Sequence, residues 1–422
     1  TFNIPNKIKQ FFVFVTRDVR SKLTNTQYML INMLEAPVLA FILAYLIKFY
    51  NTDVSNKVGY IFRENENMPA YLFMSVVVAL FIGLTVSAEE IIRDRKILKR
   101  ESFLNLSRSS YLMSKISIMF ILSAIQTFTF VLVGNYVLEI KGMWLDYWLV
   151  LFTTSCFANM LGLNISSAFN SAVTIYILIP FLIIPQLLLS GVIVKFEKLN
   201  PTITSQRTVP VAGEMMASRW AFEALAINQF AKNEYEKQFY KYDEMVSVSD
   251  FRRNYWIPHL RGKIDKSETN AKNAGTNRAE LAQDILLIQT EIKADLDRIK
   301  ELEKRRKINA ISKVLMQPME DLNKKIQAIK PEKFTKTEAD DMRNYLNLVN
   351  TVYMKVFNAN NDARDNSIRR KTEDKDPKKS EAKKAEFNKL KDDYLNESLA
   401  DLVKNSNEFN KIIEQDGILI QR

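Results

Sequence analysis

Long apolar runs fill the first half of the chain and end before Lys195. A helix needs about 20 apolar residues to cross about 30 Å of hydrocarbon, and five stretches have roughly that length. They are Tyr28–Tyr50, Ala70–Ser87, Ile116–Leu138, Trp148–Ala168 and Ala172–Val194. One such stretch alone could be a buried helix of a soluble protein, and the shortest, Ala70–Ser87, fits that alternative best. Five in succession predict an all-α membrane protein, and a sixth span is expected beyond Arg422.

The basic residues predict how these spans are oriented. Residues 1–27 combine phenylalanines with lysines and arginines, which suits an amphipathic helix that lies in the membrane interface. Basic residues are also frequent in the loop between the second and third spans, and they are few in the loops after the first and third spans. This asymmetry predicts a cytoplasmic N-terminus and places residues 199–422 outside. The expected location is the plasma membrane, which in a bacterium is the inner membrane.

Composition changes after the fifth span. Residues 1–198 hold 18 Lys and Arg against 12 Asp and Glu, whereas residues 199–422 hold 41 against 36. The two signs interleave in the second half, so a solvated helix face explains the net charge of +11 better than a nucleic-acid surface does. Cys156 and His259 are the only residues of their types, which excludes a disulfide framework, a cysteine-built zinc site and most histidine chemistry. The sequence therefore offers no catalytic and no metal-binding residues.

The second half predicts a helical domain outside the membrane. Residues 199–275 form a membrane-proximal segment whose aromatic residues suit a small packed core or a lipid-facing patch, and residues 276–422 form the rest. No glycine lies between Thr276 and Asp416, and apolar residues recur at steps of three and four from Leu281 to Leu302, as in a coiled coil or a helical hairpin. A helix from 278 to 317 would be roughly 60 Å long and would end near Pro318. Further helices are expected near 337–363 and 378–405, joined by a charged linker over 365–379.

The loop after the second span has the most informative sequence, "SAEEIIRDRKILKRESFLNLSRSSYLMSKI". Glu89 and Glu90 end the span, and Arg93, Arg95 and Lys96 follow about one helical turn later. A charged helix joined to a span can act as a lever that a cytoplasmic partner pushes. On charge alone, a solvated interfacial anchor is the simpler interpretation.

The amino-acid sequence of this loop resembles that of the corresponding loop in type-2 ABC transporter membrane domains, especially those of the G (White) subfamily. Three other segments agree in order: "FFVFVTRDVRSKLTN", "LLLSGVIV" and "MASRWAFEALAINQF" resemble the connecting helix, the end of span five and the stretch after it. The resemblance covers residues 5–230 and implies that residues 88–102 form the coupling helix, which contacts a nucleotide-binding domain. The coupling residues it implies are Glu89, Glu90, Arg93, Asp94, Arg95, Arg100 and Glu101.

The resemblance also implies a substrate path between two copies of the chain, lined by spans two and five. The residues placed on that path are Phe73, Met74, Phe81, Tyr176, Phe181, Leu187 and Leu188. The alternative is that these side chains only pack against neighbouring helices or lipid. No Gly-x-x-x-x-Gly-Lys-Ser/Thr loop occurs, so ATP and magnesium are expected on a nucleotide-binding domain in the same polypeptide or on another subunit, and no cofactor is expected on this chain.

Polar residues inside the predicted spans have two interpretations. Glu35 lies about two turns from the cytoplasmic end of span one, where it can reach the interface or pair with Lys115, although an intramembrane carboxylate can also mark a functional site. Hydrogen bonds between helices are expected for Gln126, Asn159, Asn164 and Gln186.

These features predict the membrane domain of an ABC exporter that acts as a dimer and moves an amphiphilic or lipid-like substrate outward. Its expected partners are the nucleotide-binding domain, a second copy, the lipid membrane and a periplasmic protein that binds residues 276–416; no nucleic acid is expected. Two alternatives remain: a non-transporting membrane scaffold, and an ATP-driven mechanical signalling subunit that acts through the helices outside.

Overall fold

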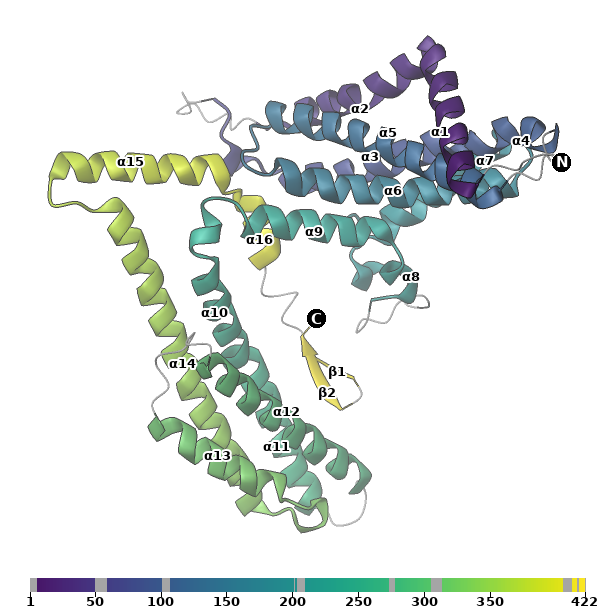
Figure 1. Ribbon diagram of the computed structural model, residues 1–422. Helices are drawn as coiled ribbons and strands as arrows, with labels where there is room; N and C mark the ends of the chain where they lie inside the picture. The colour runs from purple at the N-terminus through teal and green to yellow at the C-terminus, as the bar shows by residue number, and fades with distance from the viewer. Residues whose placement is uncertain are drawn as a thin grey trace. The chain divides into compact units, whose positions relative to one another are not determined.

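The computed structural model describes residues 6–49, 59–100, 107–200, 202, 209–272, 278–304, 313–404, 412–415 and 417–421 (Figure 1). Within these ranges the chain is helical apart from a hairpin of two antiparallel strands, β1 (Ile412–Gln415) and β2 (Ile418–Gln421). Four described helices are long and apolar enough to cross a membrane, and a fifth apolar helix is shorter. The prediction of an all-α membrane protein is confirmed.

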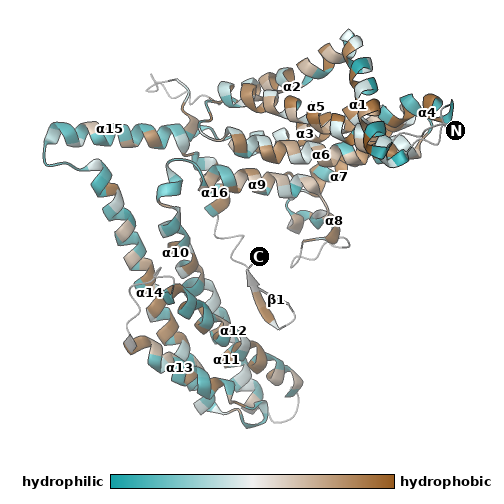
Figure 2. Cartoon of the chain, in the orientation of Figure 1, coloured by the Kyte–Doolittle hydropathy of each residue, from teal (hydrophilic) through white to brown (hydrophobic). Residues whose placement is uncertain are grey.

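The chain folds into two units, which are described separately. Unit 1 comprises residues 1–236 and 388–404, and unit 2 comprises residues 237–387 and 405–422. These boundaries differ from those predicted at residues 199 and 276, because a segment late in the chain belongs to the apolar unit. Figure 2 shows the difference in composition: α2 (Thr26–Ile47), α3 (Met68–Ala88) and α5 (Arg108–Val137) are largely hydrophobic, whereas α15 (Pro377–Tyr394) is mostly hydrophilic.

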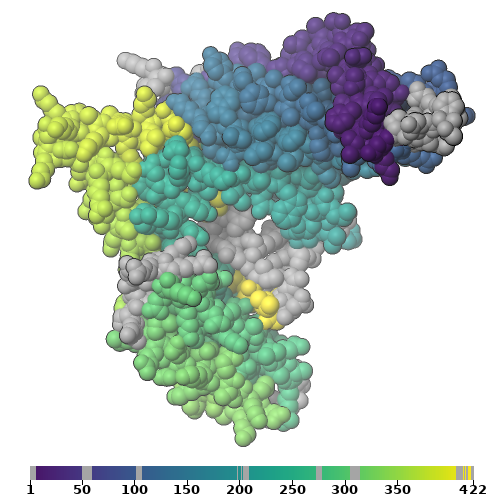
Figure 3. Space-filling view, in the orientation of Figure 1, coloured from purple at the N-terminus to yellow at the C-terminus, as the bar shows by residue number. Residues whose placement is uncertain are grey.

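Unit 1 contains the amphipathic helix, the spans and the short helices that follow them. Their bounds are α1 (Lys7–Thr24), α2 (Thr26–Ile47), η1 (Phe62–Glu64), α3 (Met68–Ala88), α4 (Glu90–Arg100), α5 (Arg108–Val137), α6 (Trp144–Ala168), α7 (Ala172–Leu188), η3 (Phe196–Lys198), α8 (Val211–Glu214), α9 (Ala217–Ala231) and α16 (Glu397–Lys404). Figure 3 shows α1 on the surface of the packed spans.

Helix α3 is the most buried span, and it packs closely against α6 through small residues. A Cβ atom added at Gly83 would overlap Ser155 and Ala158, and one added at Gly162 would overlap Ser87. Small residues let transmembrane helices approach until their backbones touch, which is the main source of attraction where lipid removes the hydrophobic driving force. The two helices therefore form one closely packed pair in the middle of unit 1.

The fifth span is shorter than predicted. Its sequence is apolar up to Val194, but α7 ends at Leu188 and the chain turns at Gly191, whose φ is +79°. The side chain of Gln186 accepts a hydrogen bond from the Ser218 N–H (3.0 Å), and the Ser218 hydroxyl donates to the Gln186 carbonyl (2.6 Å). Helix α9 thus begins beside the end of α7, and both helices pack along α3.

A segment from late in the chain completes unit 1 at the opposite end from α4. The side-chain amide of Asn396 donates to the carbonyls of Phe62 and Asn65, both at 2.9 Å. Leu399 is buried in the same apolar core as the spans, and α16 lies beside α9 and α3 (Figure 1). The predicted helix over 378–405 is therefore two helices, α15 and α16, of which the second belongs to the spans.

Unit 2 is a helical bundle with a core of its own. Its elements are η4 (Glu236–Gln238), which begins in unit 1, α10 (Tyr240–Phe251), the π-helix η5 (Arg252–Trp256), α11 (Ile257–Lys272), α12 (Arg278–Lys304), α13 (Lys313–Gln327), η6 (Pro331–Lys333), α14 (Lys336–Thr372), the first part of α15, and the two strands. The heptad-like residues of α12 are buried against α11 and α13.

The long helix predicted over 278–317 is a hairpin instead. Gln289 of α12 donates to the carbonyls of Ile326 and Ile329 near the end of α13, and Lys300 pairs with Glu320 nearer its start (2.7 Å). The two helices therefore run antiparallel. Pro318 lies inside α13, where it falls in the first turns and leaves most of the helix intact. The predicted linker is also shorter, because α14 continues to Thr372 and α15 begins at Pro377.

Candidate functional site

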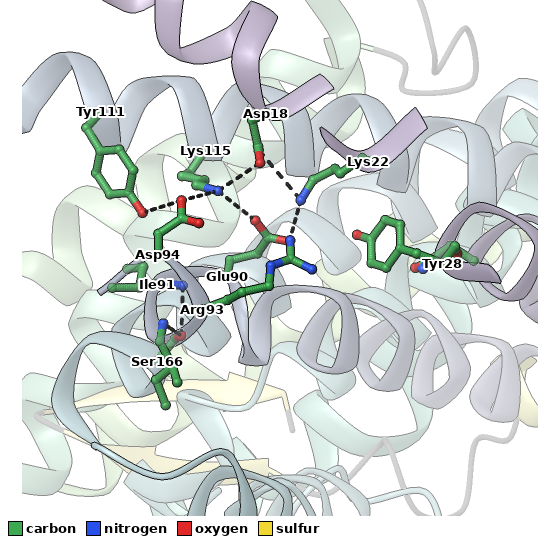
Figure 4. A network of polar contacts seen from close by, with 12 residues as sticks. Asp18, Lys22, Tyr28, Glu90, Ile91, Arg93, Asp94, Tyr111, Lys115 and Ser166 are labelled. Carbon is green, nitrogen blue, oxygen red and sulfur yellow. Dashed lines mark hydrogen bonds and ion pairs between the residues drawn. The ribbon is translucent and has the colours of Figure 1, made fainter. Parts of the chain in front are cut away.

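Charged side chains from three helices meet where α4 follows α3 (Figure 4). We call this group the ion network: it consists of Asp18 and Lys22 of α1, Glu90, Arg93 and Asp94 of α4, and Lys115 of α5. The end of unit 1 that contains it is called the α4 end, and the opposite end is called the α16 end. Tyr111 adds a phenol at the edge of the network, where its hydroxyl donates to Asp94 at 3.1 Å.

Lys115 is the centre of the ion network. Its ammonium group lies 3.0 Å from Asp18, 3.1 Å from Glu90 and 2.7 Å from Asp94. Lys22 contacts the other oxygen of Glu90 at 2.5 Å, and Arg93 contacts Glu90 at 3.2 Å. One lysine on α5 therefore joins α1 to both ends of the first turn of α4.

Burial makes these contacts energetically important. The side chains of Lys115 and Glu90 are each only 2% exposed. An ion placed in such surroundings without a partner costs several kcal/mol, so three cations and three carboxylates must remain together. Their balance keeps the network neutral overall and fixes the position of α4 against α1 and α5.

Tyr28 connects the start of α2 to the same group. Two cations of the network lie near its ring, with the Lys22 ammonium 5.3 Å and the Arg93 guanidinium 5.7 Å from the ring centroid (Figure 4). Cations attract the face of an aromatic ring, and more strongly where water is excluded. The first span is therefore attached to the network without contributing a charge.

The other side of α4 contacts the end of α6. The Ser166 hydroxyl accepts hydrogen bonds from the N–H groups of Ile91 (3.1 Å) and Ile92 (3.2 Å). Arg95 donates to the Ser167 carbonyl at 2.8 Å and to the side chain of Asn170. Helix α4 is thus held from two sides, by charges on one side and by hydrogen bonds on the other.

The residues predicted for coupling fall on different sides of α4. Glu90 and Asp94 face the ion network, and Arg95 faces α6. Glu89 lies at the junction of α3 and α4, and the Tyr176 hydroxyl of α7 donates a hydrogen bond to its carboxylate. Arg93 and Arg100 are exposed. Glu101 lies outside the described residues, as does the end of the predicted segment 88–102.

The residues predicted for the substrate path mostly lie open on the surface of this single chain. Phe73 is the exception, because it is buried and packs edge-on against Phe222 of α9 at 5.9 Å between ring centroids. Leu187 is half-buried. The exposed residues of the set are Met74, Phe81, Tyr176, Phe181 and Leu188. They form an apolar surface along α3 and α7 that lipid or a second copy could cover.

Interhelical hydrogen bonds were expected for the polar residues of the spans, and three are confirmed. Gln126 donates to the Asn32 carbonyl (2.9 Å), Asn159 donates to the Ser123 hydroxyl (2.7 Å), and Gln186 bonds to Ser218. Lys115 pairs with the three carboxylates of the network and not with Glu35, so of the two interpretations of Glu35 the pair with Lys115 is wrong. Glu35 is half-buried on α2.

Sequence reasoning did not identify Asp18, Lys22 or Ser166 as members of this site. A signal existed for the first two: Asp18 is the only acidic residue among residues 1–27, and Lys22 follows it by one helical turn. Ser166 had no such signal, because many serines in spans bond only to their own backbone. Within the described ranges, no group of three or more His, Cys, Asp and Glu side chains is placed to hold a metal ion.

A family model described as "ABC-2 type transporter" matches residues 9–230, which is more than half of the chain. The matched range includes α1, the spans, α4 and α9, and therefore every described residue of the ion network. The comparison with curated proteins gave no match.

Proposed function

The chain belongs to the ABC-2 type transporter family, and from that premise we propose that it is the membrane part of an ATP-driven exporter whose α4 receives the movement of the ATPase. It is a multi-pass membrane protein and the permease part of such a transporter, so it is not itself catalytic. ATP and magnesium would be bound by the nucleotide-binding domain that pairs with membrane domains of this family.

The ion network is the observation on which this proposal rests. A helix that receives a push must transmit it, and α4 is fixed to α1 and α5 by buried charges that cannot separate cheaply. Its outward face carries Lys96 and Arg100, both exposed. A basic face of this kind suits an acidic surface on the ATPase partner.

The α4 end is the cytoplasmic end in this proposal. ATP is hydrolysed in the cytoplasm, and the basic residues of α1 and α4 agree with a cytoplasmic position. Unit 2 would then lie outside, in a bacterium on the periplasmic side of the inner membrane.

Two copies would place the exposed apolar surfaces of α3 and α7 opposite each other. Met74, Phe81 and Phe181 are between 37% and 67% exposed in the single chain, which leaves them free to line a path. Apolar walls between two membrane helices favour an amphiphilic or lipid-like substrate, and closure of the ATPase would move it outward. The resemblance to the G subfamily supports this arrangement of spans two and five.

Charge reversal on α4 tests the proposal. The complete polypeptide with its ATPase, reconstituted in liposomes, is compared with Lys96→Glu/Arg100→Glu, which reverses two exposed charges of α4 outside the ion network. We expect ATP hydrolysis to continue while ATP-driven movement of fluorescent lipid across the bilayer falls. Arg108→Glu is the matched control, because Arg108 is an exposed arginine at the same end but on α5. Unchanged lipid movement in the double variant would contradict the proposal.

One observation favours a second function, ATP-driven mechanical signalling through unit 2. Residues 388–404 hold the loop that leads into α3, since Asn396 and Ser398 bond to carbonyls of Phe62, Asn65 and Glu66. Movement of α3 would therefore displace the segment through which the chain leaves unit 2. Replacing residues 240–385 by a short linker separates the two functions. If the protein is an exporter, the shortened protein still moves lipid. If it is a signalling protein, cells that carry the shortened protein show the same phenotype as cells that lack the whole protein.

A further inference from the structure

The start of α4 lacks a cap from its own sequence. Helix α3 ends at Ala88, α4 begins at Glu90, and the first α-helical hydrogen bond of α4 runs from the Arg93 N–H to the Glu89 carbonyl (2.9 Å). The N–H groups before Arg93 therefore have no partner within α4. The residue at the capping position is Glu89, and glutamate is not among the residues that cap helix starts well.

Ser166 supplies the missing cap from another helix. Its single hydroxyl accepts from both Ile91 and Ile92, and the residue is fully buried, so water has no access to replace it. Serine is among the best capping residues because its short side chain presents an acceptor close to the backbone. Here that acceptor comes from the last turn of α6, 75 residues away along the chain.

Arg95 of α4 makes the reciprocal contact with the C-terminal end of α6. Its guanidinium donates to the Ser167 carbonyl and to Asn170, at the end of α6 where backbone carbonyls have lost their helical partners. A cation at a helix C-terminus is also favoured by the helix dipole. Each of the two helices thus completes the other's end.

Helix α6 in turn has its tightest packing with α3. The seam of Gly83, Ser155, Gly162 and Ser87 leaves no room for the helices to slide without overlap. The ion network joins α4 to α1 and α5, and two further routes lead from α4 to α3: directly across the break at Glu89, or through Ser166 and α6. The direct route is a joint with an interrupted hydrogen-bond ladder, whereas the second route has hydrogen bonds from α4 to α6 and close packing of small residues from α6 to α3.

We propose that Ser166 is a positioning residue that makes α4 move with α6, so that the fourth span rather than the break at Glu89 transmits the ATPase movement to α3. This inference rests on the proposed function, since it concerns the same helix and the same partner. Ser166 touches neither ATP nor substrate and acts only through α4.

The first test measures movement of α3 when nucleotide binds. A Cys156→Ala protein, which has no other cysteine within residues 1–422, receives Thr85→Cys as a half-exposed sensor on α3 outside the substrate path and is reconstituted with its ATPase. The labelling rate of the sensor by a maleimide is measured with and without ATP and vanadate. If the nucleotide has no effect in this parent protein, the proposed function fails and the inference is void with it.

Ser166→Ala and Ser167→Ala are then compared in this background. Ser167 is the matched control, because its hydroxyl bonds only to the Asn164 carbonyl while Arg95 uses its backbone oxygen, which alanine retains. We expect Ser166→Ala to reduce the nucleotide-dependent change about fivefold, the equilibrium effect of one lost helix cap, with ATP hydrolysis retained. Equal responses in the two variants would overturn the inference. Ser166→Thr retains the hydroxyl and should restore the response, which a role in packing alone does not predict.

A cross-link provides the second test and does not depend on the stability of the serine variants. Arg95→Cys and Asn170→Cys are introduced together, and a short bifunctional thiol reagent joins α4 to α6. The α3 sensor is omitted here, because the reagent would also modify its thiol. If the two helices move as one body, the linked transporter keeps its ATP hydrolysis and its ATP-driven lipid movement. If the link abolishes ATP hydrolysis and its cleavage restores it, α4 must separate from α6 in each cycle and the inference is wrong.

Discussion

At its α4 end unit 1 is held by ion pairs centred on the buried side chains of Lys115 and Glu90, whereas at its α16 end the ion pairs are half exposed and the buried contact is a neutral amide. Lys115 and Glu90 are 2% exposed, but Arg63 and its partners Asp392 and Glu397 are 27%, 39% and 54% exposed. The ion pairs of the α4 end join residues up to 97 positions apart in the chain, while the α16 end brings Asn396 to Phe62 across 334 positions.

This difference in burial determines how the α4 end and the α16 end respond to an applied force. Buried charges resist separation strongly and at all salt concentrations, so the α4 end is suited to transmit force. Half-exposed pairs are individually weak and screened by salt, so the α16 end can open locally while the bundle persists. The comparison predicts a rigid α4 end and a yielding α16 end.

The largest effect is expected from Lys115→Met, which removes the centre of the ion network. Three carboxylates would then share two cations, and breaking such a buried group costs about 3–5 kcal/mol. We expect a lower unfolding temperature of the purified protein in detergent, measured by intrinsic fluorescence. The added substitution Glu90→Gln should recover part of the loss, because it removes the unbalanced charge.

Lys96→Met is the control for this prediction, since Lys96 is an exposed lysine on α4 whose loss should change stability by less than about 0.5 kcal/mol. Unfolding temperatures that agree between the two lysine variants would show that the network does not stabilise the α4 end.

A smaller and local effect is expected from Asn396→Ala at the α16 end. Asn396 caps α16 through the Leu399 N–H (2.9 Å) and satisfies two loop carbonyls, so its loss should cost about 2 kcal/mol. Hydrogen exchange of residues 395–404 should accelerate by about 30-fold, while exchange in α3 and α6 is unchanged. Asn388→Ala, an exposed asparagine of α15, should leave exchange as it is.

If α3 and α6 exchange faster together with α16 in that variant, the α16 end is not an independent opening unit. The contrast between a rigid and a yielding end would then be wrong.

The smallest effect is expected from Arg63→Met. Arg63 contacts Asp392 at 2.6 Å and Glu397 at 3.3 Å, and half-exposed pairs of this kind contribute about 0.5–1 kcal/mol. Exchange of residues 397–404 should increase a few-fold at low salt, and the difference from the unmodified protein should disappear at roughly 0.5 M salt. A difference that persists at high salt would mean that Arg63 acts by packing and not by charge.

Part of this architecture could be predicted from the sequence because it depends on local properties. The length of an apolar run determines whether a helix can span a bilayer, so α2, α3, α5 and α6 were found within a few residues of their ends, apart from the longer starts of α5 and α6. Glu90 and Arg93 were found because charge next to an apolar run is conspicuous. The amphipathic helix α1 was predicted because phenylalanines occur together with basic residues within one short segment.

The parts that escaped prediction depend on partners distant in the chain. Nothing in the sequence near Asn396 indicates that its amide donates hydrogen bonds to a loop more than 300 residues earlier. Likewise, nothing in the sequence near Ser166 indicates that its hydroxyl caps α4. Hydropathy also cannot locate the end of α7, because Leu189–Val194 remains apolar while Gly191 and the Gln186 contact to Ser218 end the helix. A hydrophobic seam fits a coiled coil and a hairpin equally, so only the contacts of Gln289 distinguished them in unit 2.

The joint between α7 and α9 makes bilayer thickness a variable for this protein. Helix α7 has 17 residues and is about 25 Å long, less than the roughly 30 Å of a typical hydrocarbon core. The remaining height on this side must come from α9, which meets α7 at Gln186 and Ser218. A lipid with longer acyl chains would therefore pull on a single hydrogen-bonded joint and not on a continuous helix. We expect activity to depend on acyl-chain length more steeply than in a bundle whose spans all cross unbroken.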